Sequence, residues 1–167
     1  MIKNGYLYKE SLTKLYTERW YDPHYKWWFS GSAHWELQLD SSDENRRHFV
    51  SVNSKDEIVG HFSYRFDYES RNACNFGMIL FDPKYKALFG RDILKHIDTL
   101  FGEWNCHSMA WSVIIGNPAE ALYDKFIKHY GGRVVGLYKD DACIYGKYYD
   151  TKAYQLMYNE YKSTKNN

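Results

Sequence analysis

The chain has 167 residues, of which 26% are charged and 19% are aromatic, and its formal net charge is +1. This length fits one domain with its own core, and the balanced charge, without a long basic run, argues against a nucleic-acid partner. Because no stretch approaches the roughly 18 apolar residues of a membrane span and no signal-peptide pattern occurs, we expect a cytoplasmic protein with no membrane partner.

Cysteine and histidine spacing gives no sign of a metal site. The three cysteines stand at positions 74, 106 and 143, an odd number with long gaps and no C-x-x-C pair. Neither a zinc site nor a disulfide framework follows from this pattern, and we expect buried, reduced thiols. The histidines are scattered without a spacing such as H-E-x-x-H, so no metal ligand is predicted.

The first quarter of the chain combines a helix with an aromatic segment. Leucines at helical spacing between lysines and glutamates predict a short amphipathic helix at about 10–18. Residues 20–29 are rich in tryptophan and tyrosine but interrupted by a proline, so we expect one or two short helical turns and loop. Apolar side chains alternate along 34–39, which favours a strand.

Strands are expected in the middle of the chain. Residues 48–52 and 58–66 alternate in polarity and flank the polar segment 53–57, which predicts a hairpin. Residues 75–81 are mostly apolar and end at an Asp-Pro pair, as in a central strand covered on both faces.

A helix, a strand and a second helix follow. One apolar face predicts a helix from Ala87 to Phe101, and alternation predicts a strand at 109–115. The second helix, from Pro118 to Tyr130, is the best specified, because Asn117 is a favoured N-cap and Gly131 can take the left-handed C-cap conformation.

The chain is predicted to close with a hairpin of 133–138 and 142–149 around 139–141, and with a C-terminal helix at 151–162. The whole order predicts one α/β (α+β) domain over residues 1–167, with a core at about 5–150 and a mixed, mostly antiparallel sheet flanked by helices.

The segment 113–136 carries the most specific signal. It predicts a strand, a capped helix with Leu122-Tyr123 inside it, and a second strand after Gly131-Gly132. This order resembles the closing half of a GNAT-fold N-acetyltransferase. The resemblance implies a GNAT-like domain, acetyl-coenzyme A as cofactor, and Tyr123 as the general acid that protonates the leaving thiolate. It also implies a cofactor contact at Asn117, which here precedes Tyr123 by six residues where seven is usual.

The strand and loop at 76–94 resemble the family's cofactor-binding motif less closely. The family's loop reads Q/R-x-x-G-x-G/A and binds pyrophosphate through backbone amides at a helix start. Here the loop from Pro83 to Gly90 looks one residue shorter, Leu88 stands where a second glycine is expected, and Lys86 best matches the first position. The cofactor-binding residues that the resemblance implies are Met78, Ile79, Leu80, Lys86, Leu88, Phe89, Gly90, Arg91 and Asn117. The alternative is an ordinary strand-to-helix turn.

The implied reaction is direct attack of an amine on the thioester carbonyl. Backbone N–H groups near Met78–Leu80 would stabilise the oxyanion, and Tyr123 would act as general acid. No residue matches the family's catalytic glutamate convincingly, since Glu36, Asp67 and Glu69 are more simply interpreted as solvated carboxylates. A chain of water molecules would then replace a dedicated base.

The aromatic segment from Trp20 to Trp35 falls where the family places the helices that wall the acceptor pocket. Trp28 and Trp35 are therefore candidate substrate-binding residues, as is His61 on a strand near the acceptor side. Aromatic walls suit a flat or apolar acceptor, or a cationic amine held by cation–π contact. The alternative is that these rings pack an N-terminal extension against the sheet.

The function predicted is N-acetyl transfer to a small-molecule or peptide amine. One alternative is a GNAT-fold protein that binds acyl-coenzyme A without catalysis, which the glycine-poor loop and the missing glutamate favour. Another is an aromatic-rich binding module for sugars or single-stranded nucleic acid, against which the neutral charge speaks. The sequence leaves the acceptor, the acyl chain length and the oligomeric state open, including a homodimer.

Overall fold

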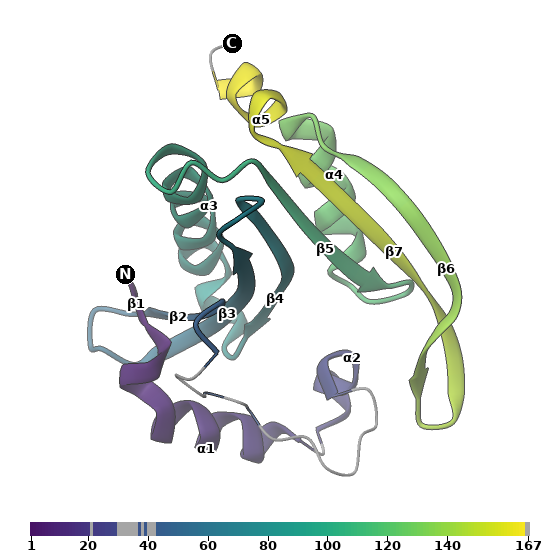
Figure 1. Cartoon of the computed structure of the whole chain (residues 1–167). Coiled ribbons are helices and arrows are strands. Elements are labelled where there is room, and N and C mark those ends of the chain that lie inside the picture. Colours follow the sequence, from purple (N-terminus) through teal and green to yellow (C-terminus); the bar gives the residue numbers. More distant parts are fainter. Residues whose placement is uncertain (21, 30–36, 38, 40–42, 166–167) are drawn as a thin grey trace.

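The computed structural model describes residues 1–20, 22–29, 37, 39 and 43–165 (Figure 1). Within these residues the chain forms one domain with a seven-stranded sheet in the order β1-β2-β3-β4-β5-β7-β6. The strands are β1 (Ile2–Asn4), β2 (Arg46–Val52), β3 (Ile58–Asp67), β4 (Asn72–Leu80), β5 (Ser108–Ile114), β6 (Arg133–Ile144) and β7 (Lys147–Met157). The helices are α1 (Lys9–Arg19), α2 (Lys26–Phe29), α3 (Lys86–Gly102), α4 (Glu120–Tyr130) and α5 (Tyr158–Lys165), with short 3-10 turns η1 (Gly5–Tyr8), η2 (Pro23–Tyr25) and η3 (Pro83–Tyr85).

The sheet is split in its middle. All neighbouring strands are antiparallel except β4 and β5, which run parallel and pair only at Asn72↔Ser108 and Ala73↔Met109. A bulge in β4 places Asn75 at a positive φ of 54° just beyond this pairing, and a bulge bends the strand that carries it. Figure 1 shows the two strands diverging from there toward α2. The mixed, mostly antiparallel sheet predicted from the sequence is therefore confirmed.

Each face of the sheet carries its own core. The alternation predicted for β3 sends Phe62 and Tyr64 into the larger cluster, which α3, α4 and α5 cover. On the opposite face, Leu12 and Tyr16 of α1 pack against Ile79 of β4 in a smaller cluster. Because both faces of β4 are covered, its near-continuous apolar sequence is explained.

Several elements match their predictions within two residues or so. These are α1, the short turns around α2, the β2–β3 hairpin, α3 and β5. The strand predicted at 34–39 lies mostly outside the described residues. Leu37 and Leu39 are described and belong to no strand, although Leu39 is buried in the smaller cluster.

The helix α4 begins two residues later than predicted. Asn117 forms a turn instead of the N-cap, because its side-chain oxygen accepts from the Ala119 amide at 2.9 Å and its backbone oxygen accepts from the Glu120 amide at 2.9 Å. The C-terminus is as predicted, since Gly131 is left-handed with φ 81° and its amide donates to Ile127.

The predicted ending of the chain is wrong. The hairpin turns at Tyr145-Gly146, where both residues have positive φ, while the predicted turn at 139–141 is a bulge within β6. The predicted helix at 151–162 is strand as far as Met157, and only α5 beyond it is helical. Burial decides this, since Tyr154 and Leu156 are both fully buried and alternate along a strand that pairs with β5 and β6.

Candidate active site

The divergence of β4 and β5 leaves the inner edge of β4 without a strand partner beyond Ala73. On its other edge the Phe81 amide donates to Val59 of β3 at 2.9 Å, and backbone groups alternate in direction along a strand. Ile79 therefore also pairs with β3, whereas Met78 and Leu80 direct their N–H and C=O groups into the cleft. The Met78 oxygen is reached there by the indole N–H of Trp28 at 2.5 Å.

Of the three residues predicted to stabilise an oxyanion, the structure thus brings two to the cleft. Ile79 is not among them, because its backbone belongs to the β3 ladder and its side chain is buried under α1. Met78 and Leu80 remain candidates through their amides. Backbone groups of alternate residues point to opposite edges of a strand, so the sequence alone could have separated Met78 and Leu80 from Ile79 only if the edge of β4 that faces the ligand were known.

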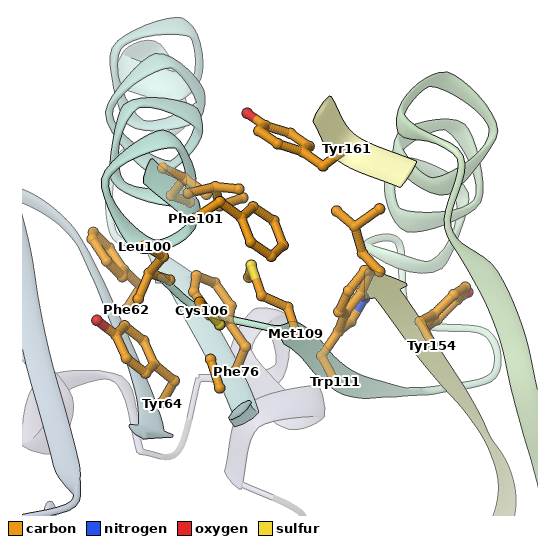
Figure 2. Packing of buried hydrophobic residues seen from close by; sticks show 14 of the residues in the cluster. Phe62, Tyr64, Phe76, Leu100, Phe101, Cys106, Met109, Trp111, Tyr154 and Tyr161 are labelled. Carbon is orange, nitrogen blue, oxygen red and sulfur yellow. The ribbon is translucent and has the colours of Figure 1, made fainter. Parts of the chain in front are cut away.

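A cavity of about 250 Å³ lies between α3 and α4 above the cleft. Figure 2 shows Phe76, Met109 and Trp111 between the two helices. The lining is almost entirely carbon and consists of Phe76, Met78, Gly90, Ile93, Leu94, Ile97, Met109, Trp111, Ala119, Leu122, Tyr123 and Phe126. Only Met78, Gly90 and Tyr123 of this set were predicted. The rest appeared in the sequence as the apolar stripes of two helices, with no sign that the stripes leave space between them.

Tyr123 lies in the wall of this cavity, in the first turn of α4. Its ring stands edge-on to Trp111 and Tyr154, with centroids 6.0 Å and 5.9 Å away. Burial raises the pKa of the hydroxyl to about 12, and no hydrogen bond joins it to another described residue. The phenol is therefore protonated at any physiological pH and has its proton free for a ligand.

The predicted cofactor loop is largely helical. The turn η3 follows Asp82, and α3 begins at Lys86, so Leu88, Phe89, Gly90 and Arg91 all lie on the helix. The Asp82 carboxylate accepts from the Lys84 amide at 3.1 Å and pairs with the Lys84 ammonium at 2.6 Å. One backbone donor near the helix start is thus already used by the chain's own carboxylate.

Phe89 explains why this segment needs no glycine-rich loop. Its side chain is buried against Gly60 of β3, where an added Cβ would stand 2.5 Å from the ring. Phe89 thereby anchors the first turn of α3 in the core, and its side chain is not available to a ligand. Gly90 faces the cavity with open space around it, while Lys86 and Arg91 are exposed and Leu88 is half-buried.

These groups fit a coenzyme A thioester. The N–H and C=O groups of Leu80 on this edge match an amide of a pantetheine arm, and the N–H of Met78 lies beside them, while the Met78 oxygen is bonded to Trp28. The exposed cations Lys84, Lys86 and Arg91 surround the start of α3, where a pyrophosphate would find positive charge and a helix N-terminus. Asn117, by contrast, holds the turn before α4 with its side chain and offers little more to a ligand.

Two tryptophans of α2 bridge the open end of the cleft. Trp28 bonds to Met78 on β4, as described above. Trp27 reaches the other half of the sheet, where its ring stands edge-on to Tyr149 of β7 at 5.5 Å and an added Cβ at Gly116 would lie 3.5 Å from it. Trp27 was not singled out in the sequence, and Trp35 lies outside the described residues.

His61 is not brought to the cavity. It is buried on the α1 face of the sheet, with its Nδ1 2.7 Å from the Tyr16 hydroxyl and its Nε2 3.1 Å from Nδ1 of His48. Its strand adjoins β4, but the side chain points away from the face that carries the cavity.

The described part of the chain shows neither a metal-binding cluster nor a membrane-spanning helix. It contains no group of three or more histidine, cysteine or acidic side chains placed to hold a metal ion. None of its helices is long and apolar enough to cross a membrane. Cys74, Cys106 and Cys143 are all free thiols; only Cys106 is buried.

A free strand edge with amides beside a carbon-lined cavity, and a protonated phenol in its wall, define an acyltransferase that uses a thioester. The chain belongs to the Acetyltransferase (GNAT) family, whose model matches residues 7–127. It is an N-acetyltransferase that uses acetyl-coenzyme A and modifies an amine.

Solved structures agree with this fold. A spermidine N-acetyltransferase from Vibrio cholerae in complex with CoA and spermine is similar with a TM-score of 0.75 and 20% identity, over 97% of each chain. The same enzyme with manganese ions gives 0.61 and 22%, over 92% of this chain and 77% of that one. A chimera of the Vibrio cholerae and hSSAT enzymes gives 0.61 and 22%, over 92% and 82%. Among curated proteins no match was found.

Proposed function

We propose that the acceptor is a small, positively charged amine that enters at the α2 end of the cleft, and that Tyr123 is the general acid. The acceptor class is inferred from the aromatic rings at the open end of the cleft, those of Trp27 and Tyr149. These rings already lie close to ammonium groups of this chain, with Lys26 Nζ 4.8 Å from the Trp27 centroid and Lys147 Nζ 5.1 Å from that of Tyr149. An acceptor ammonium would be attracted to the same ring faces.

The similar structures support this acceptor class, because they are described as spermidine N-acetyltransferases. Testing spermidine, a monoamine and a lysine-containing peptide side by side would decide the class. Release of thiol with the peptide, but with neither spermidine nor the monoamine, would contradict the proposal. The free thiols also suit a reducing compartment, so we retain the cytoplasm as the proposed location.

The chain's residues divide the reaction between them. The amide of Met78 would stabilise the oxyanion that forms when the amine attacks the carbonyl, and the backbone of Leu80 would hold the adjoining pantetheine arm. Tyr123 then donates its proton as the carbon–sulfur bond breaks. The described residues that line the cavity include no carboxylate, so the proton of the acceptor ammonium, whose pKa is near ~10.4, leaves through water.

Binding of the cofactor can be tested at Gly90. At a concentration ~100 times the dissociation constant, acetyl-coenzyme A should stabilise the fold by about 2.7 kcal/mol, seen as a rise in melting temperature. Gly90→Phe should abolish this rise, because its ring would enter the cavity. Gly90→Ala is the matched control, since its Cβ meets nothing and alanine favours a helix interior by ~0.5–1 kcal/mol. A full rise with Gly90→Phe would remove Gly90 from the site.

Acceptor binding can be tested at Trp28. Trp28→Phe keeps an aromatic ring but removes the indole N–H that holds α2 to Met78. Loss of one hydrogen bond of ~0.5–1.5 kcal/mol should raise the acceptor KM by roughly 2- to 10-fold and leave the cofactor-induced melting shift unchanged. Trp104→Phe, at a half-buried position packed edge-on against Phe66, should change neither quantity. An unaltered acceptor KM in Trp28→Phe would contradict the role.

We also propose a homodimer through the free edge of β6. Val134, Val135 and Leu137 are 43%, 53% and 67% exposed on this edge strand, an arrangement that templates pairing with another chain. Antiparallel pairing of two copies about a two-fold axis would bring Arg133 of each toward Asp140 of the other. Sedimentation should give a dimer at micromolar concentration, and Leu137→Lys should dissociate it, whereas Leu7→Lys, at another exposed leucine, should not. A monomeric wild type would rule it out.

A further inference from the structure

The cavity extends beyond the place where an acetyl group would react. The thioester would react between Met78, whose N–H would stabilise the oxyanion, and Tyr123, which would donate the proton. Phe76 also lines the cavity and precedes Met78 by two residues on β4. At ~3.3 Å per residue it lies ~6.6 Å from Met78, toward the end of β4 that pairs with β5. On α3, the lining runs from Gly90 to Ile97, or roughly 10 Å of helix. The end of the cavity at Phe76 and Ile97, which we call the deep end, therefore lies toward the part of the sheet where β4 and β5 are paired.

The deep end is suited to hydrocarbon. Among the described residues, no charged, amide or hydroxyl side chain lines it apart from Tyr123. The amides of a pantetheine arm would lose their hydrogen bonds there, whereas methylene groups would lose nothing. Pantetheine is better placed along the free edge of β4, where Leu80 offers its backbone N–H and C=O.

The volume points the same way. At about 30 Å³ for each water molecule in the liquid, 250 Å³ corresponds to roughly eight water-sized groups. The methyl of an acetyl group fills only one of these. The cavity is nevertheless smaller than the ~300–1,000 Å³ usual for drug-sized ligands, which favours a short chain over a bulky one.

We infer that the deep end is an acyl-chain subsite, and that this enzyme transfers acyl groups of about four to six carbons as well as acetyl. Single C–C bonds of about 1.5 Å advance an extended chain by roughly 1.3 Å each, so ~6.6 Å holds about five bonds. The inference rests on the proposed placement of the thioester between Met78 and Tyr123. The chemistry is unchanged: the N–C bond forms, the C–S bond breaks, Tyr123 protonates the thiolate and the amine's proton leaves through water.

The test is a series of acetyl-, butyryl-, hexanoyl- and decanoyl-coenzyme A with one amine acceptor. Each buried methylene should strengthen binding by about 4-fold. We expect the KM of the thioester to fall from acetyl to hexanoyl, turnover to stay within roughly tenfold, and activity to collapse at decanoyl. A hundredfold loss of kcat/KM already at butyryl would overturn the inference but leave acetyl transfer intact. Inactivity with every thioester would instead overturn the proposed placement.

Variants at the deep end check where the chain lies. Ile97→Phe narrows this end and should lower the hexanoyl-to-acetyl ratio of kcat/KM by at least tenfold. Phe126→Ala widens it and should raise the ratio for decanoyl, which keeps the test available if the larger side chain prevents folding. Ile127→Ala truncates a half-buried neighbour on α4 outside the lining, next to Gly132, and should leave every ratio unchanged. Unchanged ratios in both cavity variants would place the acyl chain elsewhere.

Discussion

Tyr123→Phe should lower turnover by 10²–10⁴-fold, the usual contribution of a general acid, while cofactor affinity hardly changes. The substitution removes only a hydroxyl that makes no hydrogen bond to another described residue, so the ring contacts with Trp111 and Tyr154 remain. Burial holds the pKa of this phenol at about 12, so it is always protonated. Turnover and the cofactor-induced melting shift, measured on the same preparation, separate chemistry from binding.

The matched control is Tyr130→Phe, on the same helix. Tyr130 is half-buried against Phe126 and Tyr161, and it lies outside the cavity lining. Its loss of a hydroxyl should leave turnover within about twofold. Near-normal turnover in Tyr123→Phe would mean that the ring only packs and that solvent supplies the proton.

The high pKa of Tyr123 also constrains the pH profile. A phenol that titrates near 12 cannot limit the reaction below pH 11, so the acid should cause no fall in rate on the alkaline side. The acceptor is different, because an alkylammonium with a pKa near ~10.4 must lose its proton before it attacks. Activity should therefore rise through pH 7 to 9 in wild type. An alkaline fall centred near pH 8 would point to another acid.

The sequence predicted well wherever the chain's own periodicity determines the structure. Alternation placed β2 and β3, and the Gly131-Gly132 pair ended α4 as expected. These features are local and follow from strand and helix geometry alone. The closing half of the fold was misjudged because Tyr154 and Leu156 can be interpreted as helix or strand, and only their pairing with β5 and β6 decides between them.

The site was harder to predict because it depends on which edge and which face each strand presents. His61 pairs with Ile79, the residue next to Met78 on β4, so His61 faces α1 whereas Met78 faces the cavity. Phe89 occupies a helix turn where the family resemblance implied a loop, because Gly60 opposite makes room for its ring. Such a relation between residues 29 positions apart is invisible to any local pattern.

Acidification should destabilise this protein between pH 6.5 and 4, above the pH at which its ion-paired carboxylates titrate. Three histidines are buried in the core: His48, His61 and His96, with 4%, 3% and 5% of their surface exposed. Burial, helped for the first two by the Arg46 charge, lowers the pKa of His48 to about 4, and burial alone lowers that of His96 to about 4. The pKa of His61 falls to about 3, because burial, the adjacent His48 and Arg46 all disfavour its cation.

The geometry supports these directions. His48 and His61 stack at 5.3 Å and share one contact of 3.1 Å between ring nitrogens, where only one proton fits. His96 Nε2 lies 2.9 Å from the Tyr64 hydroxyl in the other core. A charged ring in either place would lose its hydration without gaining a carboxylate partner among the described residues.

Between pH 6.5 and 4 the unfolded chain therefore binds more protons than the folded one. Stability should be complete above pH 6.5 and fall as the pH drops, by up to ~1.4 kcal/mol per pH unit for each histidine. From pH 7.5 to 5 this amounts to about 2 kcal/mol per histidine, measured by urea unfolding at each pH. Ion-paired carboxylates such as Asp82, with lowered pKa values, titrate below this window.

The variant His96→Gln cannot be protonated at this position, but its amide can still bond to the Tyr64 hydroxyl. The loss of stability of this variant between pH 7.5 and 5 should therefore be about 2 kcal/mol smaller than that of the wild type. His129→Gln, at an exposed position, should behave as wild type. Equal pH dependence in wild type and His96→Gln would show that His96 is already charged in the fold.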